Sequence, residues 1–274
     1  MTGHDASSAC PICAGASTVA LARIRDHPLR RCRDCGHSFL QIEAPATIEA
    51  LYNDHYAGFR DDPVFRSEAT RLVTDELIRR VPPPARLLDV GCGNGEFLAI
   101  ARDAGYQAIG VDVSPAAGEM CRRRGLDARI GDFRSEDVIG PDRRFELVTF
   151  WDVVEHLPDP ASFLCRALEL LAPGGLVLIK TPRTSTASVR VAAAVPRVAG
   201  ALLQSPSHVQ YFQQDGLAAL LTRVGYRGLE FLPPRGMRTP TTGGKLRRRV
   251  ARRMMRTFQS LVGDHNLLVL ARRN

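Results

Sequence analysis

The fold is decided by residues 88–97, LDVGCGNGEF, in which a glycine-rich turn separates an apolar run from a helical one. The run before the turn, residues 86–90, is short and mostly apolar, which is typical of a strand buried in a sheet. Gly91, Gly93 and Gly95 tolerate the backbone angles of a tight turn and let a bound molecule approach the backbone. Because residues 95–104 then have a helical pattern, the stretch predicts a strand, a turn and a helix.

Strand and helix patterns alternate on both sides of this turn. Such alternation predicts a parallel sheet with helices on both faces. Helical patterns occupy residues 63–80, 115–124, 160–171 and 215–224, and strand patterns occupy residues 108–113, 127–131, 145–151, 176–180, 229–232 and 266–270.

Carboxylates stand where the first strands of this sheet end. Asp89 precedes the first glycine, and Asp112 lies 21 residues after Gly91 at the tip of the second strand. A carboxylate there can accept hydrogen bonds from both hydroxyls of a ribose. After the third strand, Asp132 can accept from an adenine amino group, and Phe133 can cover the face of the ring. The pattern predicts an adenosine site.

The spacing of the glycines separates two classes of adenosine ligand. A dinucleotide fingerprint keeps GxGxxG and directs the helix N-terminus at a pyrophosphate. Here the spacing is GxGxG and Glu96 opens the helix, where an acid would repel a pyrophosphate. A cationic ligand without phosphate, S-adenosylmethionine, fits better, and a dinucleotide remains the alternative.

The successive motifs of residues 52–272 resemble those of class I S-adenosylmethionine-dependent methyltransferases. The resemblance rests on residues 87–97, 110–113, 131–133, 145–160 and 171–180. It implies a Rossmann-like α/β sheet of seven strands, the seventh antiparallel, with helices on both faces. It also implies that the methionine moiety lies near Asp89 and the Phe150-Trp151 segment. The expected cofactor contacts are Asp89, Gly91, Cys92, Gly93, Gly95, Asp112, Val113, Asp132, Phe133 and Phe150.

Four of the seven cysteines form two CxxC pairs, Cys10–Cys13 and Cys32–Cys35, with 18 residues between them. This spacing predicts a four-thiolate zinc site, and four thiolates close the coordination shell, as in a structural site. Unpaired thiols are the alternative. We expect a zinc ribbon over residues 1–45, with short strands at 18–24 and 37–42, followed by a methyltransferase domain over residues 46–274. His27 and His37 are expected on the surface.

Two segments offer groups that can take a proton from a methyl acceptor. The first follows the fourth strand and contains Asp152, Glu155 and His156. It resembles the acid-x-x-Glu-His group of ubiquinone-biosynthesis methyltransferases, where a divalent cation is associated, although that family has Glu in place of Asp152. The second contains His208, with Tyr211 beside it. The alternatives are an ordered helix start for the first segment and a packing motif for the second.

Two further segments bear on the acceptor and on partners. Residues 184–207 contain no acid and are expected to form an apolar lid insertion. Residues 240–262 are expected to form a basic helical insertion with one apolar stripe. Its arginines, Arg247–Arg256, are consistent with a solvated face, with contact to a membrane surface, or with RNA phosphates.

The charge distribution limits the classes of partner. The net charge of the 274-residue chain is +8, but residues 1–234 carry about −2, because the basic residues gather at the C-terminal end. This distribution argues for a local anionic contact and against a protein coated by nucleic acid. The first residues lack a basic and apolar leader, and no apolar stretch is long enough to span a bilayer, so we expect a cytoplasmic protein, with peripheral membrane contact through the basic insertion.

These observations lead to one expected function and two alternatives. We expect an S-adenosylmethionine-dependent methyltransferase that acts on a small molecule of lipid, quinone or sugar character, mainly at oxygen. Zinc ribbons joined to this fold also resemble sugar C-methyltransferases of antibiotic pathways. The alternatives are an RNA-modifying methyltransferase and a non-catalytic module that binds S-adenosylmethionine and a partner.

Overall fold

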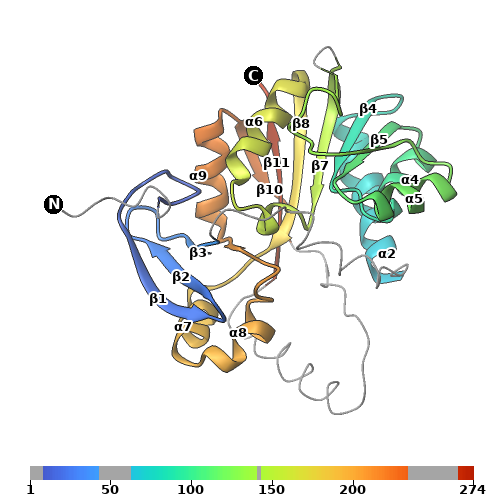
Figure 1. Cartoon of the computed structure of the whole chain (residues 1–274). Coiled ribbons are helices and arrows are strands. Elements are labelled where there is room, and N and C mark those ends of the chain that lie inside the picture. The colour runs from blue at the N-terminus through green and yellow to red at the C-terminus, as the bar shows by residue number, and fades with distance from the viewer. Residues whose placement is uncertain (1–8, 43–62, 141–142, 234–264) are drawn as a thin grey trace.

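The computed structural model describes residues 9–42, 63–140, 143–233 and 265–274, which form an α/β fold with a smaller second sheet (Figure 1). The large sheet has seven strands in the order β10-β11-β8-β7-β4-β5-β6, and the small sheet has the order β1-β2-β3-β9. The expected basic insertion at 240–262, with Arg247–Arg256, lies outside the described residues. Its proposed membrane contact therefore stays a prediction.

The large sheet is parallel except at one strand. Strands β4, β5, β6, β7 and β8 pair in parallel, whereas β11 runs antiparallel between β8 and β10. The expected antiparallel seventh strand is therefore confirmed. The strands are β4 (Arg86–Val90), β5 (Gln107–Asp112), β6 (Ala128–Ile130), β7 (Phe145–Trp151), β8 (Leu171–Pro182), β10 (Arg227–Phe231) and β11 (Asn266–Arg272).

Helices cover both faces of this sheet, so the central strands are buried on both sides (Figure 1). Alternate residues of one strand enter different cores: Leu88 packs in the core beside α6 and α9, and Leu87 in the core beside α2 and α4. This two-sided burial explains the nearly continuous apolar runs of the strands. The helices are α2 (Pro63–Leu72), α3 (Ile78–Arg80), α4 (Glu96–Asp103), α5 (Pro115–Arg123), α6 (Pro160–Leu170) and α9 (Gln214–Val224), and a π-helical turn, Val73–Leu77, joins α2 to α3.

The small sheet contains the cysteine ribbon and one strand from far along the chain. Strands β1 (Thr18–Ile24), β2 (His27–Cys32) and β3 (Ser38–Leu40) form an antiparallel sheet, and β9 (Gln210–Tyr211) pairs with β3. The expected lid insertion forms two helices, α7 (Thr186–Ala194) and α8 (Pro196–Leu202), which pack against the ribbon (Figure 1).

The expectation that His37 lies on the surface is wrong. Its side chain is only 3% exposed, and its ring lies beside those of Phe39 and Phe212. The pairing of β3 with β9 buries it, and its Nε2 forms a hydrogen bond of 2.9 Å with Gln210. Burial lowers the pKa of His37 to about 4, so the ring is neutral. Local sequence could not reveal this partner, which lies 173 residues away.

Each helix in the described part of the chain is too short or too polar to cross a bilayer.

Leu178, which is fully buried at the centre of β8, offers a test of this packing. We expect Leu178→Ala to lower the free energy of unfolding by about 2–5 kcal/mol, because the structure cannot close the resulting cavity. The matched change Val195→Ala removes an apolar side chain that is 47% exposed and should change stability by less than about 0.5 kcal/mol. Urea unfolding of both variants measures the difference. Equal losses would contradict the described core.

Candidate functional site

The glycine turn joins β4 to α4 at the carboxyl edge of the large sheet. Gly91, Gly93 and Gly95 adopt φ angles of 72°, 52° and 75°, which residues with a side chain rarely adopt. A Cβ atom on Gly91 would lie 2.6 Å from Cγ2 of Val153. The turn therefore needs glycine for its conformation, and it lies directly against the loop that follows β7.

Asp112 fixes this turn from the neighbouring strand. At the end of β5, its Oδ2 accepts a hydrogen bond of 2.9 Å from the backbone N–H of Gly93, and its Oδ1 accepts one of 2.9 Å from Ser114. The carboxylate is 4% exposed. Two fixed backbone donors hold it at the position expected for a ribose-binding acid.

Asp89 is the second buried carboxyl at this edge. It is 2% exposed, and its Oδ1 accepts a hydrogen bond of 2.7 Å from Oγ1 of Thr149. Burial raises the pKa of Asp89 to about 7. Cys92 is buried beside it in the turn, and Val113 is partly buried after β5. The residues predicted from the two strand ends therefore meet in one place.

Two further predicted cofactor residues, Asp132 and Phe133, follow β6 and have contacts that the sequence did not reveal. Asp132 accepts hydrogen bonds from Arg134, with 2.6 Å from Nη2 to Oδ2, and Arg134 lowers the pKa of that carboxyl. The guanidinium also lies 4.8 Å from the ring centre of Phe163. Phe133 is 2% exposed and packs against Phe150 and Phe163 in the core.

These residues fit a cofactor that carries an adenosine and a positive charge. The turn presents backbone to the ligand, and the carboxylates stand at the ends of adjacent parallel strands, where ligands of such sheets bind. Glu96 is 4% exposed in the first turn of α4, with Nε of Arg66 at 3.5 Å from its Oε1. The acids at this edge fit a cationic sulfonium and would oppose a pyrophosphate.

A second group of titratable side chains gathers beyond β7. Glu155 and His156 lie on a short 3₁₀ helix, Val154–His156, and His208 precedes β9. One ligand atom from each of these three residues lies within 4.8 Å of the others. The rings of His156 and His208 are 4.7 Å apart at their centres. The two candidate segments of the sequence therefore form one cluster, which we call the Glu155 cluster.

Glu155 is the most buried member of the Glu155 cluster. Its side chain is 1% exposed, and Oε2 accepts a hydrogen bond of 2.8 Å from Thr181. Its Oε1 has no hydrogen-bond partner among the described residues and lies 3.9 Å from Nε2 of His156. Burial, with a contribution from the charge of Asp152, raises the pKa of Glu155 to about 8. Oε1 of Glu155 can therefore act as a base or as a metal ligand.

Asp152 is not one of the three residues that could hold a metal ion in the Glu155 cluster, although its charge acts on Glu155. Its carboxylate forms an ion pair with Lys180 of β8, whose side chain is 1% exposed and lies 5.9 Å from the ring centre of Trp151. Asp152 also has a positive φ of 50°. The sequence signal for this pair was a lysine at the end of an apolar strand, and its partner was not predicted.

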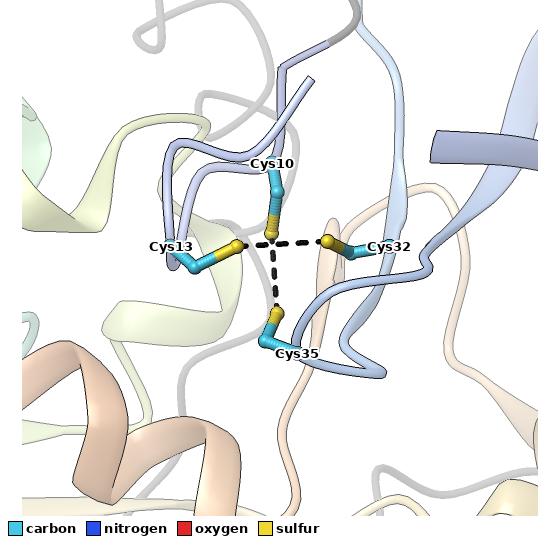
Figure 2. Close-up of side chains that lie close together, drawn as sticks. All are labelled: Cys10, Cys13, Cys32 and Cys35. Atoms are coloured by element: carbon cyan, nitrogen blue, oxygen red, sulfur yellow. Dashed lines mark hydrogen bonds between the residues drawn. The ribbon is translucent and has the colours of Figure 1, made fainter. Parts of the chain in front are cut away.

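The four ribbon cysteines converge on one centre (Figure 2). The Sγ–Sγ distances are 3.6 Å for Cys10–Cys35 and 3.5 Å for Cys13–Cys32, and all four sulfurs lie within 4.8 Å of one another. A disulfide needs about 2.05 Å. Tetrahedral zinc with bonds of about 2.3 Å places its sulfurs roughly 3.8 Å apart, so the four thiols fit a zinc ion.

Comparison with known protein families agrees with this geometry. The family described as "Methyltransferase domain" matches residues 65–230, more than half of the chain. The chain belongs to this methyltransferase family. The predicted class, an S-adenosylmethionine-dependent methyltransferase of class I, is confirmed.

Individual relatives and solved structures are also similar to this methyltransferase. It is 30% identical over 170 residues to a ubiquinone biosynthesis O-methyltransferase of Xylella fastidiosa, a match that covers 60% of this chain and 69% of the relative. In other relatives with that name, the match covers 40–66% of their length. A SAM-dependent methyltransferase of Archaeoglobus fulgidus superposes with a TM-score of 0.54 at 20% identity, over 82% of this chain and 100% of that one.

One structural neighbour is named for a different reaction. The [4+2]-cyclase SpnF superposes with a TM-score of 0.55 at 19% identity, over 85% of this methyltransferase and 98% of the cyclase. At this identity the likeness concerns the fold alone. The fold alone therefore does not identify the acceptor.

The cysteine ribbon of the methyltransferase leads to a direct prediction. Freshly purified protein should contain about one zinc per chain. Cys10→Ser should abolish zinc binding and lower the melting temperature, because the ribbon loses a ligand. Cys165→Ser, at an exposed cysteine of α6, should leave both unchanged. Elemental analysis and thermal unfolding measure the two effects. Wild-type protein without zinc would contradict the assignment.

Proposed function

We propose that this methyltransferase transfers the methyl group of S-adenosylmethionine to a hydroxyl of a small molecule with lipid, quinone or sugar character. The observation that supports this proposal most directly is the Glu155 cluster, because Glu155 lies on the loop that contacts the glycine turn. Val153, two residues before Glu155, already packs against Gly91. A proton-accepting group next to the methyl donor is what a hydroxyl acceptor requires.

The cofactor site that we propose follows the sequence prediction. Asp112 binds the ribose, the turn presents its backbone to the ligand, and Asp89 lies near the methionine moiety. Asp132 faces the adenine amino group and is oriented by Arg134. The proposed contacts are Asp89, Gly91, Cys92, Gly93, Gly95, Asp112, Val113, Asp132, Phe133 and Phe150, within a domain that begins near residue 46.

Within the Glu155 cluster, the hydrogen bonds define which atoms can accept a proton. The Nδ1 of His156 is 2.7 Å from the carbonyl oxygen of Ser207, so it must carry the hydrogen and donate it. In the neutral ring, Nε2 then keeps its lone pair and faces Oε1 of Glu155. We assign Oε1 of Glu155 as the atom that accepts the hydroxyl proton, with His156 and His208 orienting the acceptor.

Bound S-adenosylmethionine supplies the sulfonium methyl group that is displaced in line. The chain contributes position and charge. The glycine turn positions the cofactor, and the Glu155 cluster positions the acceptor. The same three side chains fit a divalent cation, which would lower the pKa of a coordinated hydroxyl. The ribbon zinc would be structural, because its four thiolates leave no open position.

Binding of S-adenosylhomocysteine tests the cofactor site without knowledge of the acceptor. We expect Asp112→Ala to weaken binding of S-adenosylhomocysteine roughly 10- to 100-fold, because the carboxylate no longer accepts hydrogen bonds from the two ribose hydroxyls. Asp103→Ala, at the end of α4, should leave the dissociation constant unchanged, since its side chain is 61% exposed. Calorimetry measures both. Binding of NAD without binding of S-adenosylhomocysteine would overturn the assignment.

Methyl transfer itself is tested by incubating the protein with labelled S-adenosylmethionine and a crude extract of small molecules and RNA, followed by identification of the labelled product. A labelled small molecule methylated at oxygen is expected. Labelled RNA would favour the RNA-modifying alternative, and cofactor binding without any labelled product would favour a non-catalytic module.

With the identified acceptor, the pH profile tests Glu155. Its carboxyl has a raised pKa of about 8 and accepts a proton only when ionised, so kcat should rise with pH and level off above about pH 8. Glu155→Gln should lower kcat about 10²- to 10⁴-fold. Glu169→Gln, at a side chain that is 65% exposed, should preserve the profile. A profile of wild-type protein that is flat from pH 6 to 9 would exclude Glu155 as the base.

A further inference from the structure

The ribbon and the Glu155 cluster share one short segment of chain, residues 207–211. On one side, Phe39 of β3 pairs with Gln210, and the N–H of Leu40 donates to the carbonyl of Val209 over 2.9 Å. On the other side, the N–H of Val209 donates to the carbonyl of Glu155 over 2.8 Å. The segment therefore connects the cysteine ribbon to the residues at the acceptor site.

A buried pair of side chains strengthens this connection. His37 and Gln210 are each 3% exposed, and Nε2 of His37 lies 2.9 Å from Oε1 of Gln210. The amide nitrogen of Gln210 donates to the carbonyls of Leu157, at 2.9 Å, and Pro158, at 3.3 Å. Because this amide nitrogen donates, its oxygen accepts, and the hydrogen of the His37 ring must lie on Nε2.

The same histidine is built into the cysteine site. The backbone N–H of Cys32 donates to the carbonyl of His37 over 2.8 Å, and Cys35 precedes His37 by two residues. A continuous series of hydrogen bonds thus runs from the cysteine knuckle through His37 and Gln210 to the loop that carries His156. Buried hydrogen bonds of this kind hold a loop in one conformation, since breaking any of them leaves a polar group without a partner.

We propose that the ribbon is a positioning element of the acceptor site, and that His37 and Gln210 are the positioning residues that hold His156 and His208 together. This inference rests on the proposed role of the Glu155 cluster. The ribbon reaches the proposed acceptor site through β9 and needs no contact with the cofactor, whose proposed residues lie at the ends of β4, β5 and β7 and beyond β6. Loss of the hydrogen bond between His37 and Gln210 should therefore change the arrangement of the proposed acceptor site and leave cofactor binding unchanged.

The test uses full-length protein with ¹³C-labelled histidine rings, so it needs no acceptor. Gln210→Met keeps the length of the side chain and removes its hydrogen bonds. At fixed pH, the ring signals of His156 and His208 should move, while the dissociation constant of S-adenosylhomocysteine stays unchanged. The control Thr18→Val removes a ribbon hydrogen bond of 2.9 Å from Arg30 that does not touch β9, and it should leave these signals in place. Signals that do not move in Gln210→Met would overturn the proposal.

A second pair of variants covers the case in which Gln210→Met does not fold, as judged by circular dichroism. His37→Leu removes the donor, and His37→Gln replaces it with an amide N–H. The signals of His156 and His208 should move in His37→Leu and return toward their wild-type positions in His37→Gln. Identical spectra of the two variants would contradict a role for the hydrogen bond.

Once an acceptor is known, the same variants separate this inference from the proposed function. We expect Gln210→Met to lower kcat roughly 10- to 100-fold, with KM for S-adenosylmethionine unchanged, because a displaced group misaligns the acceptor. If Glu155→Gln abolishes turnover but Gln210→Met keeps wild-type spectra and kcat, only this inference fails. If the spectra move but Glu155→Gln keeps full activity, the proposed function fails.

Discussion

The hydrogen bonds of Asp112 are the constraint on which the proposed cofactor site of this molecule depends. One carboxylate accepts from the backbone of Gly93 in the turn and from Ser114 at the start of α5. It therefore joins two strand–helix units at the edge where they would hold a ligand. The turn with its positive φ angles lies between β4 and α4, and residues of both elements are packed in the cores of the sheet.

The proposed acceptor end is organised differently, by contacts between segments far apart in the chain. Glu155 follows β7, His208 precedes β9, and β9 belongs to the sheet of the ribbon. Burial keeps one oxygen of Glu155 without a partner among the described residues and raises its pKa. The helical insertion α7–α8 packs on the same ribbon, so the ribbon, the insertion and β9 form one structural unit beside the methyltransferase sheet.

This division explains what the sequence could and could not predict. The turn, Asp112 and the strand–helix alternation are local patterns, and the structure follows them closely. The cysteine spacing is also local, and the four sulfurs converge as expected. The pairing of β3 with β9 was missed because a strand of two residues has no periodicity, and with it the burial of His37 and the role of Gln210. The ion pair of Asp152 with Lys180 was missed because its members lie 28 residues apart in the chain, Asp152 just after β7 and Lys180 on the neighbouring strand β8.

The central claim is that the glycine turn and the Glu155 cluster hold the two ends of one methyl transfer. A crystal structure of the complex with S-adenosylmethionine tests it most directly, through the direction of the sulfonium methyl group. We predict that the ribose hydroxyls bind Asp112 and that the methyl carbon points toward Glu155, with room for one acceptor oxygen at roughly 3 Å from both. A methyl group directed away from Glu155, or a cofactor that does not contact Asp112, would contradict the account.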